Sequence, residues 1–124
     1  MNKRFDKLDI NNNNTFNNKE LIGNIGRYIG QVLNGKQEGK GIEYYNNGER
    51  YEGEYRNDKR EGKGIYYYAN GDRYEGDWRN NKFEGKGIFY FANGDRRMGD
   101  YANDKPIGKH VILTRNFEVK IKNY

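Results

Sequence analysis

The sequence predicts an all-β protein in which antiparallel hairpins follow one another along the chain. Three observations lead to this fold class: a repeat of 23 residues, an Asn-Gly pair at the same place in each of the first three repeats, and glycines at fixed positions within β-prone segments. Of the 124 residues only 33% are apolar, yet there are 12 tyrosines and 17 glycines. This composition suits a fold stabilised by ring packing, in which each unit packs only on its neighbours.

Four repeats are predicted, and the first three align without gaps. They occupy residues 27–49, 50–72, 73–95 and 96–118. The fourth repeat has His110 and Phe117 where the others have glycine. Terminal repeats are often atypical because one of their faces lacks a neighbour. Residues 1–26 form an Asn-rich leader outside this pattern, and residues 119–124 form a tail.

Each repeat is predicted to contain a strand, a polar loop, a second strand and a tight turn. In the second repeat, residues 51–56 alternate in polarity as a strand does, residues 57–62 form the polar loop, and residues 63–68 are again β-prone. The pair Asn70-Gly71 then closes the unit, because both residues tolerate the positive φ of a two-residue type I′ turn. The same pair closes the neighbouring repeats at 47–48 and 93–94.

Two-residue turns would fix the register of the paired strands, and with it the face of every side chain. They place Tyr44 opposite Tyr51 and Ile42 opposite Gly53. The equivalent predicted pairs are Tyr67–Tyr74, Ile65–Gly76, Tyr90–Arg97 and Ile88–Gly99. A large side chain would then lie opposite a glycine in every unit, since a strand glycine leaves room for a neighbour on the backbone.

One face of the sheet is therefore predicted to be aromatic and the other charged. The aromatic face would carry Tyr28, Tyr44, Tyr51, Tyr55, Tyr67, Tyr74, Trp78, Tyr90 and Tyr101. The charged face would carry a basic column of Arg27, Arg50, Arg73 and Arg96 beside a mostly acidic column of Gln31, Glu54, Asp77 and Asp100.

The pattern Tyr-x-Gly-x-[Tyr/Trp]-x-Asn…Gly-x-Gly…Asn-Gly over residues 27–118 resembles the MORN (membrane occupation and recognition nexus) family. The resemblance implies an elongated, twisted, single-layer sheet of successive hairpins. It also implies a role in membrane-associated scaffolds, cytoskeletal complexes or dimeric assemblies, and some members bind a partner helix along the aromatic groove. Related repeats are appended to lipid kinases and to a lysine methyltransferase, so a regulatory repeat region is a further alternative.

The first functional hypothesis is a non-catalytic scaffold that binds protein. Its aromatic face would receive an apolar helix or a second copy of the chain, because large exposed apolar surfaces mark interaction sites. Catalysis is not expected, since the chain has one histidine, His110, and no cysteine. Its carboxylates recur with the repeat and do not form one special pair. No cofactor is expected.

The alternative hypothesis is an adaptor for anionic membranes, including phosphoinositides. The net charge of +5 is concentrated beyond residue 95, because basic and acidic residues balance over 27–95. The cations that would contact the lipid are Arg96, Arg97, Lys105, Lys109, Arg115, Lys120 and Lys122. Each cation near such a surface contributes about 1 kcal/mol. The balanced charge of the repeats argues against nucleic acid as a partner.

The N-terminal segment allows three interpretations. Residues 9–20 resemble an EF-hand loop whose oxygen-bearing side chains would bind Ca²⁺. The ligands would be Asp9, Asn11, Asn13, Thr15, Asn17 and Glu20. Asn14 stands where such a loop has glycine, the exit helix would run into the first repeat, and there is no second hand. The segment is otherwise a capping strand or decayed repeat, or an Asn-rich leader without fixed structure.

The last alternating segment, residues 117–122, predicts a strand that covers the open edge of the sheet. Its lysines would discourage self-association there. The sequence has no cysteine, no apolar run long enough to cross a bilayer and no apolar signal region. We therefore expect a soluble intracellular protein, located in the cytoplasm or peripherally at a membrane or the cytoskeleton.

Overall fold

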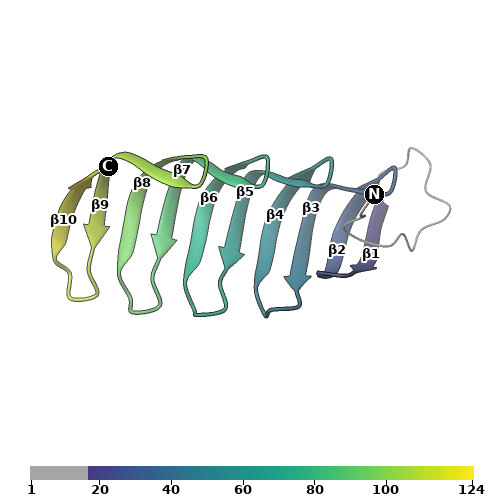
Figure 1. Cartoon of the computed structure of the whole chain (residues 1–124), viewed down its shortest axis with the longest axis horizontal. Helices are drawn as coiled ribbons and strands as arrows, with labels where there is room; N and C mark the ends of the chain where they lie inside the picture. The colour runs from purple at the N-terminus through teal and green to yellow at the C-terminus, as the bar shows by residue number, and fades with distance from the viewer. Residues whose placement is uncertain (1–16) are drawn as a thin grey trace.

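The computed structural model describes residues 17–124, which form one antiparallel sheet of ten strands in chain order. The strands lie side by side in a single elongated layer (Figure 1). They are β1 (Asn17–Gly23), β2 (Gly26–Leu33), β3 (Lys36–Tyr45), β4 (Arg50–Arg56), β5 (Lys59–Tyr67), β6 (Arg73–Arg79), β7 (Lys82–Tyr90), β8 (Arg96–Ala102), β9 (Lys105–Leu113) and β10 (Val119–Asn123). The predicted fold class is confirmed.

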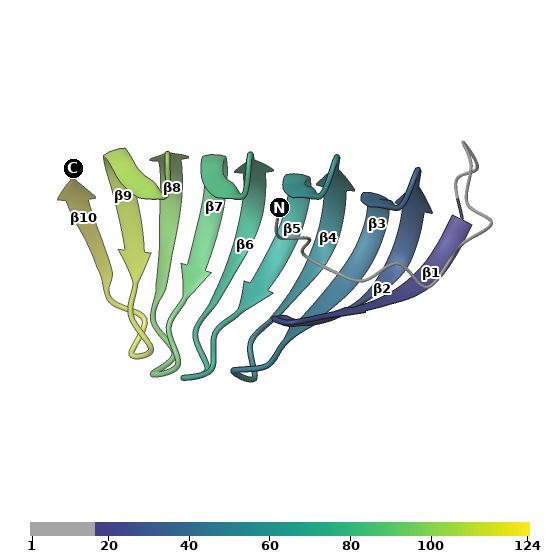
Figure 2. The ribbon, with the colours of Figure 1, turned by 45° about the vertical axis from the view of Figure 1, so that its right-hand side comes forward.

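The turns form two rows, one along each long edge of the sheet (Figure 2). In one row each turn has two residues in the left-handed conformation. Arg56 pairs directly with Lys59, and Asn57 and Asp58 have φ values of 52° and 68°. Asparagine and aspartate tolerate this region better than most residues, and it defines a type I′ hairpin. The polar loop predicted over 57–62 was therefore wrong, because β5 already begins at Lys59.

The Asn-Gly pairs at 47–48, 70–71 and 93–94 lie in the other row, and these turns contain three residues. Tyr45 donates its N–H to the Glu49 carbonyl at 2.9 Å, and Gly48 donates to the Tyr45 carbonyl at 3.1 Å. Gly48 has a φ of 91°, as the last residue of a three-residue hairpin loop requires. The prediction of two-residue turns at these positions was wrong.

The extra turn residue shifts the predicted register by one, and a shift of one moves a side chain to the opposite face. Tyr51 lies opposite Glu43, Tyr44 lies opposite Arg50, and Ile42 lies opposite Glu52. The predicted pairs Tyr44–Tyr51, Ile42–Gly53, Tyr67–Tyr74, Ile65–Gly76, Tyr90–Arg97 and Ile88–Gly99 are all displaced in this way.

Cross-strand partners share a face, so the observed register defines the two faces of the sheet. We call one the tyrosine face, which carries Tyr28, Tyr51 and Tyr74. We call the other the charged face, which carries Arg27, Arg50, Arg73 and Arg96.

Glycine lies opposite glycine on the tyrosine face because tyrosine rings lie across these positions. Gly53 pairs with Gly64, and a Cβ atom at Gly64 would lie 2.2 Å from the Tyr51 hydroxyl oxygen. That hydroxyl donates to the Glu54 carbonyl at 2.9 Å. The space left by the strand glycines is thus filled by a tyrosine that reaches along the sheet, and not by the residue opposite.

Edge-to-face contacts join the buried rings into one continuous ring column. Neighbouring centroids lie between 4.9 and 5.4 Å apart, within the range of favourable aromatic pairs. In order of contact the column contains Tyr28, Tyr55, Tyr51, Trp78, Tyr74, Tyr101, His110 and Tyr124. No second layer of described residues covers the sheet, so this column is the core of the protein.

His110 occupies the place of a tyrosine in the column. The fourth repeat has Arg97 where the others have Tyr28, Tyr51 and Tyr74, and it has His110 where they have glycine. The His110 ring is fully buried and lies against Gly99. Its Nε2 lies 2.8 Å from the Asp100 carbonyl, which matches the tyrosine bond to Glu54. Since a carbonyl only accepts, Nε2 carries the proton.

Hydrogen bonds between successive turns tie each repeat to the next. Asp58 Oδ1 accepts the N–H of Gln37 at 2.8 Å, and the N–H of Asp58 donates to the Gln37 carbonyl at 3.0 Å. The equivalent bonds recur in the next two repeats. Each repeat is therefore held to its neighbour by its turns as well as by strand pairing.

Strands close both ends of the repeats. Residues 17–23 form β1, which pairs with β2, so the exit helix of the EF-hand interpretation is wrong. Glu20 instead forms an ion pair with Arg27 at 3.6 Å. Of the other predicted Ca²⁺ ligands, Asn17 begins β1, and Asp9, Asn11, Asn13 and Thr15 lie outside the described residues. At the opposite end β10 pairs with β9, which confirms the predicted last strand.

Candidate functional site

The nine residues predicted to form one aromatic binding face do not share a face. Six lie buried in the ring column, namely Tyr28, Tyr51, Tyr55, Tyr74, Trp78 and Tyr101. The register shift places the other three, Tyr44, Tyr67 and Tyr90, on the charged face. Their placement together was therefore wrong, and the exposed aromatic surface has to be found elsewhere.

Trp78 illustrates why the ring column is not itself a docking surface. Only 4% of the residue is exposed, and its indole Nε1 donates to the Gly64 carbonyl at 3.1 Å. Its ring makes edge contacts with both Tyr51 and Tyr74. A partner could not reach this ring without opening the core.

A second set of rings lies beside the column on the tyrosine face, and these rings are half-buried. We call it the outer aromatic row, and it contains Tyr45, Tyr66, Tyr68, Phe89 and Phe91. Successive centroids are separated by 5.8, 4.8, 5.7 and 4.8 Å. Four of these rings pack against the buried cluster. The row thus presents a continuous aromatic surface on a rigid base.

An arginine flanks the row toward each end. The Arg60 guanidinium carbon lies 5.3 Å from the Tyr66 centroid, and Nη1 donates to the Tyr45 hydroxyl at 3.2 Å. The Arg97 guanidinium carbon lies 5.5 Å from the centroids of both Phe89 and Phe91. A guanidinium is attracted to the face of an aromatic ring, so the row offers apolar contact flanked by positive charge.

The hydroxyl groups of Tyr66 and Tyr68 in the row are held in the neutral form. Burial raises the pKa of Tyr68 to about 12, and burial together with the hydrogen bond to Glu49 raises the pKa of Tyr66. The Tyr66 hydroxyl donates to Glu49 at 2.8 Å. Burial opposes ionisation of Glu49, but hydrogen bonds from Tyr66, Ala69 and Asn47 outweigh it and lower the pKa of that carboxyl.

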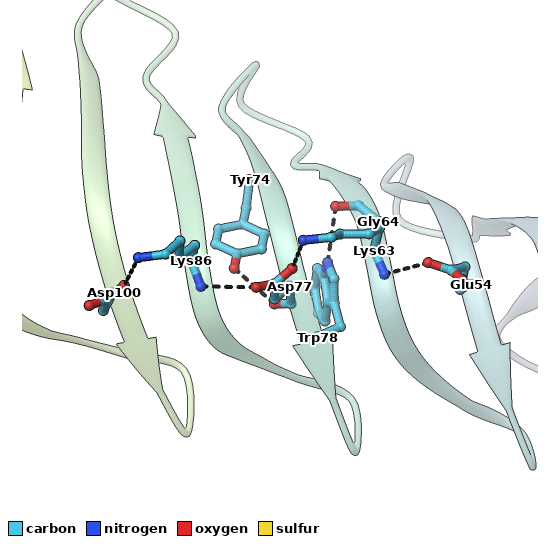
Figure 3. A network of polar contacts seen from close by, with 8 residues as sticks. All are labelled: Glu54, Lys63, Gly64, Tyr74, Asp77, Trp78, Lys86 and Asp100. Atoms are coloured by element: carbon cyan, nitrogen blue, oxygen red, sulfur yellow. Dashed lines mark hydrogen bonds and ion pairs between the residues drawn. The ribbon is translucent and has the colours of Figure 1, made fainter.

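The charged face carries a row of alternating cations and carboxylates (Figure 3). The N–H of Lys63 donates to Glu54 at 2.7 Å, and its ammonium group pairs with Asp77. Asp77 accepts the N–H of Lys86 at 3.1 Å, and Lys86 Nζ lies 3.5 Å from Asp100. The predicted acidic column therefore satisfies local N–H groups and lysines and is not a free acidic surface.

Arginines and tyrosines alternate in a neighbouring row of the charged face. The guanidinium carbon of Arg50 lies 3.8 Å from the Tyr67 centroid, and that of Arg73 lies 3.8 Å from the Tyr90 centroid. The hollows on this face are shallow, and one of about 640 Å³ is lined by Ile29, Ile42 and Glu52 among others. Part of the charge on this face is therefore paired, and two of its rings are covered by arginine.

The seven C-terminal cations do not form a single patch. Lys120 and Lys122 lie on the tyrosine face, because Lys122 pairs with His110. Arg96 lies on the charged face, where it approaches Tyr90. Arg97 donates to the hydroxyls of Tyr101 and Tyr124. The remaining cations are Lys105, Lys109 and Arg115, all of which are exposed. All seven cations belong to β8, β9, β10 or the turn between β9 and β10.

No group of three or more histidine or acidic side chains within residues 17–124 is arranged to hold a metal ion. The same part of the chain contains no helix, and hence none long and apolar enough to span a membrane.

Comparison with known families agrees with this geometry. A profile of the MORN repeat matches residues 28–50, 51–73 and 74–96, which is more than half of the chain. The chain belongs to the MORN repeat family. No curated protein shows significant similarity to it. The MORN profile starts one residue later than the repeat inferred above, and it ends where the fourth, atypical hairpin begins.

Sequence reasoning missed all five residues of the outer aromatic row. The signal that would have located them is the recurring left-handed pair Asn57-Asp58, since such a pair closes a hairpin as well as Asn-Gly does. Its counterparts are Asn34-Gly35, Asn80-Asn81 and Asn103-Asp104. With two-residue turns assigned to those positions, the Asn-Gly turns could have been three residues long and the register would have been correct.

Proposed function

We propose that this MORN protein is a non-catalytic scaffold that binds a protein partner through the outer aromatic row. The observation that carries the proposal is a continuous surface of five half-buried rings on the tyrosine face. Tyrosine and arginine are the residues on which binding energy concentrates at protein interfaces. The fitting partner is an apolar helix face or strand with carboxylates toward Arg60 and Arg97.

The cellular setting is part of the same proposal. MORN repeats form a repeat module and not a catalytic fold, so the chain would contribute binding to an assembly rather than chemistry. The absence of cysteine from the sequence suits the reducing interior of the cell. We place the protein there, at membrane-associated or cytoskeletal assemblies.

The test compares adjacent residues that face opposite sides of the sheet. The variant Tyr68→Thr with Phe91→Thr changes the outer aromatic row, whereas Tyr67→Thr with Tyr90→Thr changes the charged face. Affinity purification from cells should lose a specific partner with the first pair and retain it with the second. Equal loss of the partner by both double variants, with unchanged thermal unfolding, would exclude the outer aromatic row as the contact surface.

A second function, binding of anionic membranes, is favoured by the terminal edge. Phe117 is 84% exposed at the tip of the last three-residue turn, and Val119 is 68% exposed. Arg115 belongs to the same turn as Phe117, and Lys120 follows Val119 in the sequence with its side chain on the opposite face of the sheet. Exposed apolar groups among cations are typical of proteins that lie on anionic bilayers.

Flotation with phosphoinositide-containing and neutral vesicles tests this second function. Binding should require the anionic lipid, survive near-physiological salt, and fall when Arg115 and Lys120 are replaced with glutamate. Unchanged flotation after charge reversal would show that the terminal edge is not the lipid contact.

A further inference from the structure

We infer that the outer edge of β10, with which no strand of residues 17–124 pairs, is a strand-addition site for an extended segment in which apolar and acidic residues alternate. This inference concerns the terminal edge of the sheet and does not depend on the outer aromatic row.

The backbone of β10 presents unpaired groups along one side. Glu118 accepts from Thr114, and Tyr124 donates to Gly108 at 2.9 Å. Because bonding alternates along an antiparallel pair, Lys120 and Lys122 direct their backbone groups toward β9. Val119, Ile121 and Asn123 direct theirs away from it. Within residues 17–124 no strand pairs with this outer side.

The side chains of β10 define what an added strand should carry. Lys120 and Lys122 project from the tyrosine face, while Val119 and Ile121 project from the charged face. Val119 and Ile121 are 68% and 51% exposed. An added strand therefore places acidic residues opposite the lysines and apolar residues opposite valine and isoleucine, since oppositely charged cross-strand pairs stabilise a sheet.

The ring column also reaches this edge incompletely. Tyr124 is its last ring and is 43% exposed, whereas Tyr51 and Tyr74 within the column are fully buried. Its ring contacts His110 on one side, and the Lys122 ammonium lies 5.2 Å from its centroid. An added strand would cover this ring as the neighbouring repeat covers the others.

A second copy of the chain fits this edge poorly. Antiparallel pairing of β10 with its own copy, centred on residue 120, 121 or 122, sets Lys120 or Lys122 opposite a lysine of the copy. Like charges directly opposite each other destabilise a sheet. Lysines on an edge strand thus hinder self-association while leaving the edge open to an acidic strand from another protein.

The experiment uses the full chain and short synthetic peptides in which valine alternates with glutamate or with lysine. The glutamate peptide should bind the natural chain and protect the amides of Ile121 and Asn123 from hydrogen exchange. The variant Lys120→Glu with Lys122→Glu should bind it about tenfold more weakly, from two reversed cross-strand pairs, and should prefer the lysine peptide.

The backbone requirement is tested at Ile121. Ile121→Pro removes an outward N–H without touching the bonds to β9 and should abolish binding, whereas Ile121→Thr keeps that N–H and should retain most of it. Thermal unfolding confirms that both variants fold. Equal binding to Ile121→Pro, equal binding of both peptides to the natural chain, or no binding of the glutamate peptide would each overturn the inference. Loss of binding in the Phe91→Thr variant would reassign the peptide to the outer aromatic row.

Discussion

In the fourth repeat His110 supplies the buried ring that a tyrosine, at the position of Arg97, supplies in the other repeats. Replacing His110 with glycine, alone and together with Arg97→Tyr, tests whether the histidine substitutes for that tyrosine. His110→Gly removes edge contacts with Tyr101 and Tyr124 and the bond to the Asp100 carbonyl. Each ring contact contributes about 0.5–1.5 kcal/mol and the hydrogen bond about 1 kcal/mol. The single variant should therefore lose about 3 kcal/mol of unfolding free energy.

The double variant should recover much of this loss. A tyrosine at position 97 would extend over Gly99 and the new glycine, as Tyr74 extends over Gly76 and Gly87. Its hydroxyl would donate to the Asp100 carbonyl, as the Tyr74 hydroxyl donates to the Asp77 carbonyl at 2.9 Å. Arg97→Tyr alone should destabilise by about 1–3 kcal/mol, because two rings then compete for one site.

Urea unfolding, followed by circular dichroism, measures the unfolding free energy of the natural chain, the two single variants and the double variant. Amide exchange at Val111 and Ile112 localises the effect. The two substitutions should couple favourably by at least about 2 kcal/mol. Additive effects, or a double variant less stable than His110→Gly, would refute the reasoning that histidine substitutes for the tyrosine.

Further expectations concern the glycines, the last turn, the core and the tyrosines. Gly64→Ala should cost more than about 3 kcal/mol in urea unfolding, because its Cβ would collide with Tyr51. Gly48→Ala, which has open space but a φ of 91°, should cost only about 1 kcal/mol; equal costs would contradict this. Phe117→Gly should raise stability by about 1 kcal/mol, because Phe117 has a φ of 66°, and an unchanged melting temperature would argue against strain there. Trp78→Thr should lose about 3–5 kcal/mol, and a stable variant would show that Trp78 is not core. Burial raises the pKa of Tyr68 to about 12, so the unfolded chain releases its proton first. The stability that Tyr68 contributes should be complete below the usual tyrosine pKa and be lost as pH rises toward 12. Phenolate absorbance and circular dichroism should change together over that range, and early ionisation without unfolding would contradict the burial.

The fold class was predictable because the repeat is visible without any structural information. Gly53 and Gly76 recur in phase with the tyrosines, and this period alone identifies hairpins that pack on their neighbours. The strand over residues 119–123 was predictable from simple alternation. These features depend on local pattern, which a sequence contains in full.

The face of each side chain was not predictable from the same pattern. It depends on whether the Asn47-Gly48 turn has two residues or three, and the Asn-Gly pair is compatible with both. One residue of difference moved Tyr44 and Tyr67 to the charged face and brought Tyr45 and Tyr68 beside the core. The replacement of a tyrosine ring by His110 was likewise not predictable, because recognising it requires the positions of residues 97 and 110 relative to each other in space.

Site-specific photo-crosslinking tests the central claim most directly, namely that the outer aromatic row is the surface that binds the partner. A photoreactive phenylalanine analogue is placed at position 68, on the row, or at position 67, its sequence neighbour on the charged face. The account predicts a crosslink to one protein from position 68 and none from position 67. That crosslink should be competed by the natural chain and not by its Phe91→Thr variant. A crosslink from position 67 alone, or competition by both chains alike, would contradict it.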